Sequence, residues 1–351
     1  MQWMIYGANG YTGELIARAA ARAGLRPCLA GRRADRVEPL ARELGLPWRA
    51  FALDEAAVVA QGLGDMDLVL HCAGPFSATS ALMIEGCLTV GAHYLDITGE
   101  APVFEHTHAA QQARRALAAG VVLCSGVGFD VIPTDCVALK LRQVMPDATH
   151  LSLGFDTDSG LSPGTAKTVV EGLGEGCLER RHGELVTVGM ARGKRQIDFG
   201  RGKKWAMTIP WGDVSTAFYT TGIENIDTWV PAPRPVIAGA RLMNLFRPLL
   251  RTAPVQGFLK RLVERWVTGP DDSRRAATPT YVWGEARNSR GEVTTVRVRT
   301  ANGYSLTVDG ALAVVRFLLN NRPQGGSYTP AMLMGEALVE SLPGSGQLTV
   351  D

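Results

Sequence analysis

The chain has 351 residues, of which 46% are hydrophobic and 20% charged. This is typical of a globular protein too long for one hydrophobic core, so we expect two domains. Its 36 Lys and Arg residues against 34 Asp and Glu residues leave a net charge of +2, which gives no overall attraction to nucleic acid. The cysteines and histidines lack the spacing of a metal site, so we expect no metal, and reduced thiols in a cytoplasmic protein.

The first 135 residues alternate short apolar runs with amphipathic runs. The apolar runs predict strands at 2–6, 26–30, 48–52, 67–72, 92–97 and 121–125. The amphipathic runs predict helices at 11–23, 35–44, 55–62, 78–90 and 101–118. This alternation predicts an α/β domain over 1–135, with a Rossmann-type, doubly wound parallel sheet. Such sheets bind ligands beyond the carboxyl ends of their strands.

The sequence GANGYTG at 7–13 places Gly7, Gly10 and Gly13 between the first strand and the first helix. Glycine permits a tight turn and lets a pyrophosphate approach the backbone amides at a helix N-terminus. The spacing GxxGxxG is a variant of the dinucleotide fingerprint, and its place after a first strand strengthens the prediction. We expect the turn residues Asn9, Tyr11 and Thr12 to contact the cofactor as well, with packing as the alternative for the Tyr11 ring.

The second strand predicts which dinucleotide binds. An NAD-binding chain carries an acidic residue about 20 residues after the glycines. Here the sequence LAGRR at 29–33 places Arg32 and Arg33 at that point. Two guanidinium groups suit a 2′-phosphate, so we expect NADP(H) rather than NAD(H). We expect Asp35 to cap the next helix, because Asp35 and Glu38 have the spacing of a capping box.

Two further stretches end strands on the same edge of the predicted sheet. Asp54 follows the third strand and is either a helix cap or a contact to adenine. The sequence HCAGPF at 71–76 ends the fourth strand. Its small residues permit close approach of ribose and nicotinamide, and its proline ends the strand ladder. We therefore expect cofactor contacts from Cys72, Ala73, Gly74 and Pro75.

The pattern changes beyond residue 136. A strand at 150–158, a helix at 164–178 and extended runs at 185–190, 205–209, 214–220 and 226–230 are predicted. The run 294–300 alternates valine with arginine, and Asn302-Gly303 predicts a hairpin turn into a strand at 304–308. Helices are predicted at 309–320 and 330–342. We expect a second α+β domain at 136–325, built on a mixed, largely antiparallel sheet, and a C-terminal segment at 326–351.

The segment 234–267 is unusually basic. Between Arg234 and Arg265 it holds seven Lys and Arg residues against Glu264 alone, and its second half has the spacing of an amphipathic helix. Three interpretations remain open. The segment packs on its own domain or forms a homodimer contact, it attaches peripherally to an anionic membrane, or it docks an acidic acyl carrier protein.

At GANGYTG, AGRR, CAGPF, YLDITGE (94–100) and GFDVIPTD (128–135) the chain resembles saccharopine dehydrogenase-like oxidoreductases. More narrowly, with TPAMLMGEALVESLPGSG at 329–346, it resembles the trans-acting enoyl reductases of lipid and polyketide synthesis. The resemblance implies an NADPH-dependent reductase whose last helix packs back on the nucleotide domain. Where the family usually shows Gly-Gly-Thr, this chain has Ser162-Pro-Gly-Thr165, which alters that loop.

For an enoyl thioester, hydride would pass to the β-carbon and a proton to the α-carbon, so the site must stabilise an enolate oxygen. Backbone amides at a helix start can do this, and we expect them at Gly164-Thr165 or in the turn 129–134. The expected catalytic residues are Asp96, Asp130 and Thr165. For Asp96 and Asp130, loop bracing and helix capping are the alternatives.

Two rival functions follow from the same residues. Reduction of an imine or amino-acid adduct would need arginines that hold carboxylates, and the candidates are Arg180, Arg181, Arg192 and Arg195, which we expect in exposed loops. The rival outside enzymes is a lipid-associated protein that binds NADP without turnover. The identity of the small-molecule or acyl substrate does not follow from the sequence.

Overall fold

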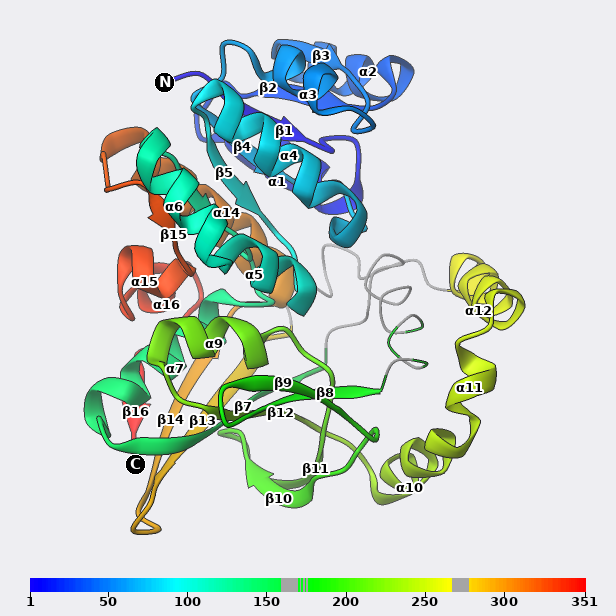
Figure 1. Cartoon of the computed structure of the whole chain (residues 1–351), viewed down its shortest axis with the longest axis vertical. Helices are drawn as coiled ribbons and strands as arrows, with labels where there is room; N and C mark the ends of the chain where they lie inside the picture. Colours follow the sequence, from blue (N-terminus) through cyan, green and yellow to red (C-terminus); the bar gives the residue numbers. More distant parts are fainter. Residues whose placement is uncertain (159–169, 171, 173, 175, 267–277) are drawn as a thin grey trace. The chain divides into compact units, whose positions relative to one another are not determined.

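The computed structural model describes residues 1–158, 170, 172, 174, 176–266 and 278–351. The chain forms two compact units (Figure 1). The first unit holds Met1–Ile132 and Leu306–Leu338, and the second holds Pro133–Ser305 and Val339–Asp351. The first unit therefore includes the whole of the predicted helix 309–320, which the sequence analysis assigned to the second domain.

The first unit is built on a parallel sheet of seven described strands in the order β15-β6-β5-β4-β1-β2-β3. Six were predicted from the sequence, and the two-residue β15 was not. The Rossmann-type class is confirmed. The central strands are buried along their whole length, as expected for parallel strands covered on both faces. The strands are β1 Trp3–Tyr6, β2 Cys28–Gly31, β3 Trp48–Ala50, β4 Leu68–His71, β5 His93–Asp96, β6 Val122–Cys124 and β15 Gly326–Ser327.

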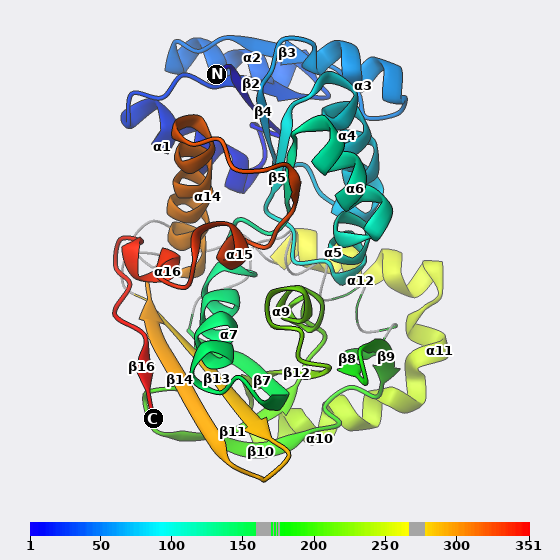
Figure 2. The same ribbon diagram turned by 60° about the vertical axis from the view of Figure 1, so that its left-hand side comes forward.

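Helices cover both faces of this sheet. Figure 2 shows α1 and α14 on one side and α4, α5 and α6 on the other. The predicted helix 101–118 is two helices that meet at Ala109. The helices of this unit are α1 Tyr11–Arg22, α2 Ala34–Leu44, α3 Ala56–Leu63, α4 Phe76–Val90, α5 Ala101–His108, α6 Ala110–Ala119, α14 Gly303–Asn320 and α15 Pro330–Met334.

The second unit is built on a mixed sheet in the order β10-β11-β12-β7-β13-β14-β16, with β8 paired to β12 and β9. Its described pairs are antiparallel except β7 with β12, so the predicted class is confirmed here too. The strands are β7 Ala148–Thr157, β8 Cys177–Arg181, β9 Glu184–Val188, β10 Lys194–Asp198, β11 Lys203–Thr208, β12 Asn225–Pro231, β13 Thr280–Asn288, β14 Val293–Thr300 and β16 Thr349–Val350.

Helices α7 Ile132–Val144 and α9 Asp213–Thr221 lie beside this sheet in Figure 1. A Cβ added at Gly284 of β13 would lie 2.5 Å from Val137 Cγ1 of α7, so the helix packs directly on the strand. The helical segments α10 Arg234–Met243, η1 Asn244–Phe246, α11 Arg247–Leu250 and α12 Ala253–Trp266 follow one another along one edge of the unit (Figure 1). We call residues 234–266 the basic arm.

Several predicted elements were wrong. The extended run 214–220 is the helix α9. The predicted hairpin at Asn302-Gly303 is the start of α14, where the Asn302 Oδ1 accepts a hydrogen bond from the Tyr304 amide at 3.0 Å. An asparagine side chain can cap a helix as readily as it can form a turn, and the sequence alone did not separate the two. Most of the predicted helix 164–178 lies outside the described residues, and its last two residues open β8.

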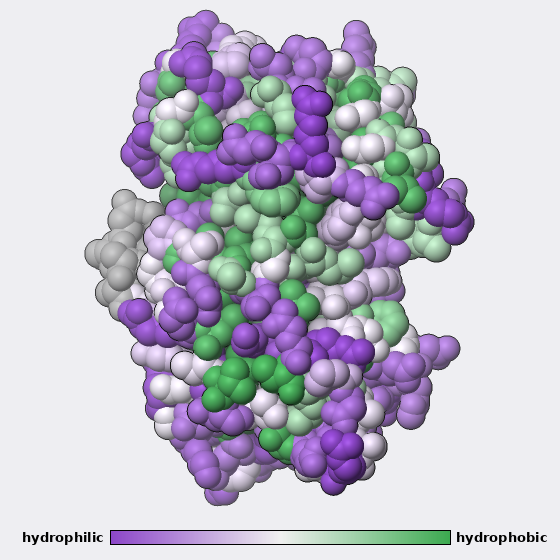
Figure 3. All heavy atoms as spheres, turned by 90° about the vertical axis from the view of Figure 1, so that its left-hand side faces the viewer, coloured by the Kyte–Doolittle hydropathy of each residue, from purple (hydrophilic) through white to green (hydrophobic). Residues whose placement is uncertain are grey.

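The C-terminal segment 326–351 takes part in both sheets. Its β15 pairs with β6 in the first unit, and its β16 pairs with β14 in the second. The predicted helix 330–342 is two short helices, α15 and α16 Leu338–Ser341, separated by Gly335 at φ +83°. Figure 3 shows hydrophobic side chains interspersed among hydrophilic ones, as on most globular proteins.

No helix in the described ranges is long and apolar enough to cross a membrane. The described His, Cys, Asp and Glu side chains also include no group of three or more that could hold a metal ion.

Candidate dinucleotide site

Two of the three glycines are required by the protein's own packing. Gly7 has φ +83°, and a Cβ there would lie 2.7 Å from the Ala73 amide nitrogen. A Cβ at Gly13 would overlap the carbonyl oxygen of Gly7. The turn after β1, the first turn of α1 and the segment after β4 can therefore approach one another only because these two residues lack side chains.

Gly10 is different. A Cβ there would meet only the Gly7 carbonyl oxygen, at 3.3 Å, so the protein itself does not demand glycine at this position. Gly10 is the N-cap residue of α1, and no described side chain caps this helix. Its neighbours Asn9 and Tyr11 are exposed, and Thr12 is half-buried. The turn thus presents a helix N-terminus with room for a pyrophosphate, and core packing does not account for the exposed Tyr11 ring.

The N-terminus of α4 offers no such place. The Glu100 carboxylate accepts hydrogen bonds from the amides of Phe76 at 2.9 Å and Ser77 at 2.8 Å. A second anion at this helix start would meet the Glu100 charge. Between these two helix starts, the one at α1 is the one that suits a phosphate. The sequence analysis missed Glu100, because its partners lie 23 and 24 residues earlier in the chain.

The edge after β2 is cationic. Arg32 and Arg33 follow the strand directly and both are exposed. Arg33 pairs with Asp35, its Nε lying 3.0 Å from Asp35 Oδ1, and this pairing lowers the pKa of the Asp35 carboxyl. The prediction that Asp35 caps the helix was wrong, because α2 begins at Ala34 and Arg33 is the N-cap residue.

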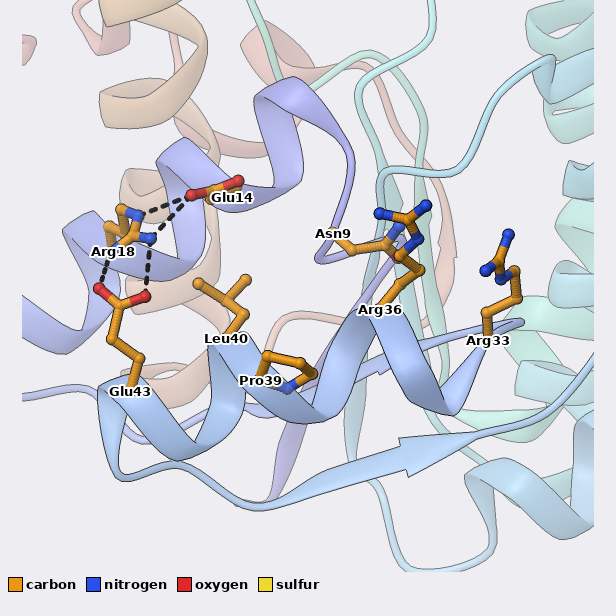
Figure 4. A pocket seen from close by; sticks show the side chains of 8 residues that line it. All are labelled: Asn9, Glu14, Arg18, Arg33, Arg36, Pro39, Leu40 and Glu43. Atoms are coloured by element: carbon orange, nitrogen blue, oxygen red, sulfur yellow. Dashed lines mark hydrogen bonds and ion pairs between the residues drawn. The ribbon is translucent and has the colours of Figure 1, made fainter.

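Arg36 extends this cationic edge, and the sequence analysis missed it. It lies in the first turn of α2, close to Asn9 in Figure 4. Asn9, Arg33 and Arg36 line one end of an open pocket of about 490 Å³. At the other end Arg18 is held between Glu14 and Glu43, at 2.8 and 2.6 Å. The available signal was the sequence RRADR at 32–36, which has a third arginine just after the arginine pair.

Asp54 is exposed beyond the carboxyl end of β3. It does not cap α3, whose N-cap residue is Glu55. The charges of Asp54 and Arg32 both act on the hydroxyl of Tyr6, in opposite directions. Burial, the largest cause, raises the pKa of Tyr6 to about 12, while Arg32 lowers it and Asp54 raises it. Asp54 and Arg32 therefore lie near the same point at the carboxyl ends of β1, β2 and β3.

The segment after β4 is held by backbone and hydroxyl contacts. The Cys72 amide donates to the Tyr6 carbonyl at 2.7 Å, and the Thr79 hydroxyl donates to the Ala73 carbonyl at 2.8 Å. Burial lowers the pKa of His71 to about 3, so its ring is neutral, and its Nε2 lies 2.9 Å from the Thr79 hydroxyl oxygen. Cys72 and Ala73 are half-buried and Gly74 and Pro75 exposed, as cofactor contacts would require.

The three expected catalytic residues have different fates. Asp96 is 0% exposed, and its carboxylate accepts from the Tyr94 hydroxyl at 2.7 Å and from the amides of Thr98 and Gly126 at 3.0 and 2.8 Å. It braces the loops after β5 and β6, which was the alternative role for this residue. Thr165 lies outside the described residues.

Asp130 is half-buried in the loop after β6. A Cβ added at Gly99, in the loop after β5, would lie 2.9 Å from Asp130 Oδ2, so the carboxyl group packs closely on that loop. Burial raises the pKa of this carboxyl from its ordinary value of 3.8 to about 6. Of Asp96 and Asp130, Asp130 is therefore the acid that is partly exposed and that holds a proton up to about pH 6.

The parallel sheet, the glycine turn at a helix without a described side-chain cap and the cationic edge are typical of a dinucleotide-binding domain. Residues 3–124 match the model of the saccharopine dehydrogenase NADP binding domain. The first unit therefore carries an NADP-binding domain of the saccharopine dehydrogenase type, and the protein is an NADP-binding oxidoreductase. The expectation of NADP(H) is confirmed at the level of the domain.

The relatives agree with this class. A protein of Mycobacterium tuberculosis named as a candidate trans-acting enoyl reductase is 24% identical, over 98% of this chain and 95% of its own. The human saccharopine dehydrogenase-like oxidoreductase is 28% identical, over 49% of this chain and 46% of its own. Apo saccharopine dehydrogenase (L-Glu forming) of Saccharomyces cerevisiae shares the fold, with a TM-score of 0.66 at 10% identity over 100% of this chain and 99% of that one.

The glycines allow a contrast between ligand binding and folding. Gly10→Val should abolish NADPH binding and leave the protein folded, because the new side chain occupies the space of the pyrophosphate but meets little of the protein. Gly13→Ala should instead lower the free energy of unfolding by roughly 1–3 kcal/mol through overpacking. Calorimetric titration with NADPH and thermal unfolding measure the two effects. A folded Gly10→Val protein with wild-type NADPH affinity would show that the glycines serve only the turn.

The cationic edge should select the cofactor. NADPH should bind at least tenfold tighter than NADH, a difference of about 1.4 kcal/mol, because Arg32, Arg33 and Arg36 can hold the 2′-phosphate. Arg32→Asp and Arg36→Asp should each reduce or reverse this ratio. Arg42→Asp is the matched control, because Arg42 lies on the same helix and pairs with Glu38. Equal dissociation constants of the wild type for NADPH and NADH would contradict the assignment.

Proposed function

We propose that the protein is an NADPH-dependent reductase that reduces the C=C bond of an acyl or polyketide enoyl thioester, acting in trans on a substrate made by another enzyme. The relative that matches nearly the whole chain is named for this activity. A shared name at 24% identity is not enough by itself. The proposal depends on the contacts of the candidate arginines, which an imine or amino-acid adduct would need as carboxylate ligands.

Reduction of an amino-acid adduct calls for cationic side chains that hold carboxylates. The expectation that the candidate arginines lie in exposed loops was wrong for three of the four, since Arg180 and Arg181 lie on β8 and Arg195 on β10. Arg180 is 4% exposed and donates to the carbonyls of Val214 and Gly183, both at 2.7 Å.

The other two strand arginines are also engaged. Arg181 pairs with Glu179. Arg195 pairs with Glu285 at 2.7 Å, and its guanidinium carbon lies 4.8 and 5.0 Å from the ring centroids of Trp229 and Trp283. Arg180 joins β8 to α9, and Arg195 joins β10 to β13. Arg192 is exposed, and the buried Nε and Nη2 atoms of Arg195 have no hydrogen-bond partner in the described structure. Two of the four candidates, Arg180 and Arg181, are thus already paired within the second unit, which favours a substrate without paired carboxylates.

NADPH, when bound, supplies the hydride. The remaining requirement is a proton for the α-carbon, and the Asp130 carboxyl can hold one. Of the two helix starts expected to stabilise an enolate oxygen, Gly164-Thr165 lies outside the described residues. In the turn 129–134, the Phe129 amide already donates to the Thr307 hydroxyl at 3.0 Å, so any donor to the substrate must come from elsewhere in this turn.

The proton-donor role of Asp130 predicts a pH dependence. If the protonated acid is needed, kcat should fall as pH rises through about 6. Asp130→Asn should lower kcat at least tenfold and remove this limb of the pH profile, whereas Asp130→Glu should retain it. Unchanged kcat and an unchanged profile in Asp130→Asn would contradict the role.

Stability gives an independent measurement of the same carboxyl group. Because the folded pKa lies above the ordinary value of 3.8, the group contributes stability that is fully present below about pH 4 and is lost as pH rises through about 6. Asp130→Asn should remove this part of the pH dependence of thermal unfolding. This control separates a loss of activity from a loss of the fold.

The substrate class can be tested with a panel of synthetic substrates. We expect oxidation of NADPH, followed by its absorbance, with 2-enoyl thioesters of pantetheine or coenzyme A. We expect at least tenfold lower kcat/KM with an amino-acid semialdehyde plus glutamate, which supplies an imine. The reverse order would establish the imine-reducing alternative. Tight NADPH binding without turnover on any member of the panel would favour a binding protein.

A further inference from the structure

The basic arm exposes an apolar stripe. Leu242, Leu245, Phe246 and Leu249 follow the spacing i, i+3, i+4 and i+7, which places them on one face of a helical path. Their exposed fractions are 58%, 74%, 53% and 57%. Seven of the fourteen exposed large hydrophobic side chains among the described residues lie in this arm, although it is under a tenth of the chain.

The opposite face of the arm binds its own unit through polar groups. Arg241 donates to the Ala191 carbonyl at 2.8 Å, the Asn244 Oδ1 accepts from the Met190 amide at 2.7 Å, and Arg251 donates to the Gly174 carbonyl at 2.9 Å. An amphipathic helix on a globular protein normally buries its apolar face and exposes its polar face. Over residues 241–251 Leu250 is buried, but polar groups make much of the contact with the unit and the apolar stripe faces water.

The stripe continues into α12. Phe258 and Leu262 are spaced i, i+4 and are 61% and 45% exposed. Packing of the apolar face of this helix on its own domain was one of the interpretations left open by the sequence, and such packing leaves these two side chains uncovered. Exposed apolar surface of this extent marks a site of interaction.

The charge of the arm indicates what covers the stripe. Its seven basic residues against Glu264 give +6. The contacts that hold Arg234 and Arg241 are neutral, since Arg234 stacks 4.4 Å above the Trp205 ring and Arg241 binds backbone carbonyls. A second copy related by two-fold symmetry would bring two such charges together and be repelled. The partner must therefore be both apolar and anionic.

We propose that the basic arm docks the protein on an anionic lipid bilayer. Its leucine and phenylalanine side chains would enter the interface between headgroups and acyl chains, while its arginines and Lys260 meet the acidic headgroups. The apolar residues extend over the four successive helical segments α10, η1, α11 and α12 along one edge of the unit (Figure 1). An extended lipid surface can contact all four segments at once, which favours it over a small acidic protein.

The experiment uses the full-length protein and sedimentation with vesicles. The protein should bind vesicles of phosphatidylcholine mixed with phosphatidylglycerol, bind phosphatidylcholine vesicles weakly, and dissociate as salt shortens the range of electrostatic attraction to a few Å. The double variant Leu245→Ser/Phe246→Ser should bind at least tenfold more weakly. So should Lys260→Glu/Arg261→Glu/Arg265→Glu, and neither variant should change NADPH affinity.

Matched controls lie in the first unit. Leu117→Ser removes an equally exposed leucine, 50% exposed on α6, and Arg42→Glu reverses an exposed arginine on α2. Both should bind the acidic vesicles like the wild type. Absence of binding to the acidic vesicles, or equal loss in the controls and the arm variants, would overturn the proposal. Two other results would also overturn it, if the protein does not bind vesicles. One is a dimer that the arm variants disrupt, and the other is binding to an acyl carrier protein.

Discussion

The first unit depends on a close backbone approach that only glycine permits. The turn after β1 packs against the segment after β4 at Gly7, and the first turn of α1 packs against the carbonyl oxygen of Gly7 at Gly13. Any side chain at either position would push the helix away from the strand. The cofactor site follows from this constraint, because it fixes the start of α1 next to the carboxyl ends of the central strands. Gly10 has few neighbouring protein atoms, and its missing side chain leaves space for a phosphate.

Three helices start at the same edge of the sheet, and their N-termini differ in the charges placed beside them. Glu100 satisfies the amides of α4 with the protein's own carboxylate. The start of α1 has no described side-chain cap, and the start of α2 carries three arginines. A negative ligand is therefore attracted to α1 and α2 and is kept from α4. At the carboxyl end of β5 the buried Asp96 accepts three hydrogen bonds, two of them from the loops after β5 and β6, so this acid stabilises the edge itself.

The sequence predicted those features that depend on local patterns. Six strands, the glycine turn and the arginine pair after β2 are each visible in short windows. What it did not predict depends on contacts between distant residues or on a choice between two local outcomes. Glu100 reaches across to α4, and Arg195 is fixed by tryptophans from β12 and β13. Asn302 could begin a turn or a helix. The start of α2 lies one residue earlier than predicted, so Asp35 forms an ion pair with Arg33 and does not cap the helix.

The central claim is that the arginines at the start of α2 bind the 2′-phosphate of NADPH beside the glycine turn. Competition against bound NADPH by 2′,5′-ADP and by 5′-AMP tests it most directly, because the two molecules differ only in that phosphate. The account predicts that 2′,5′-ADP displaces NADPH at a concentration at least tenfold lower than 5′-AMP does. Equal displacement by the two molecules would contradict it.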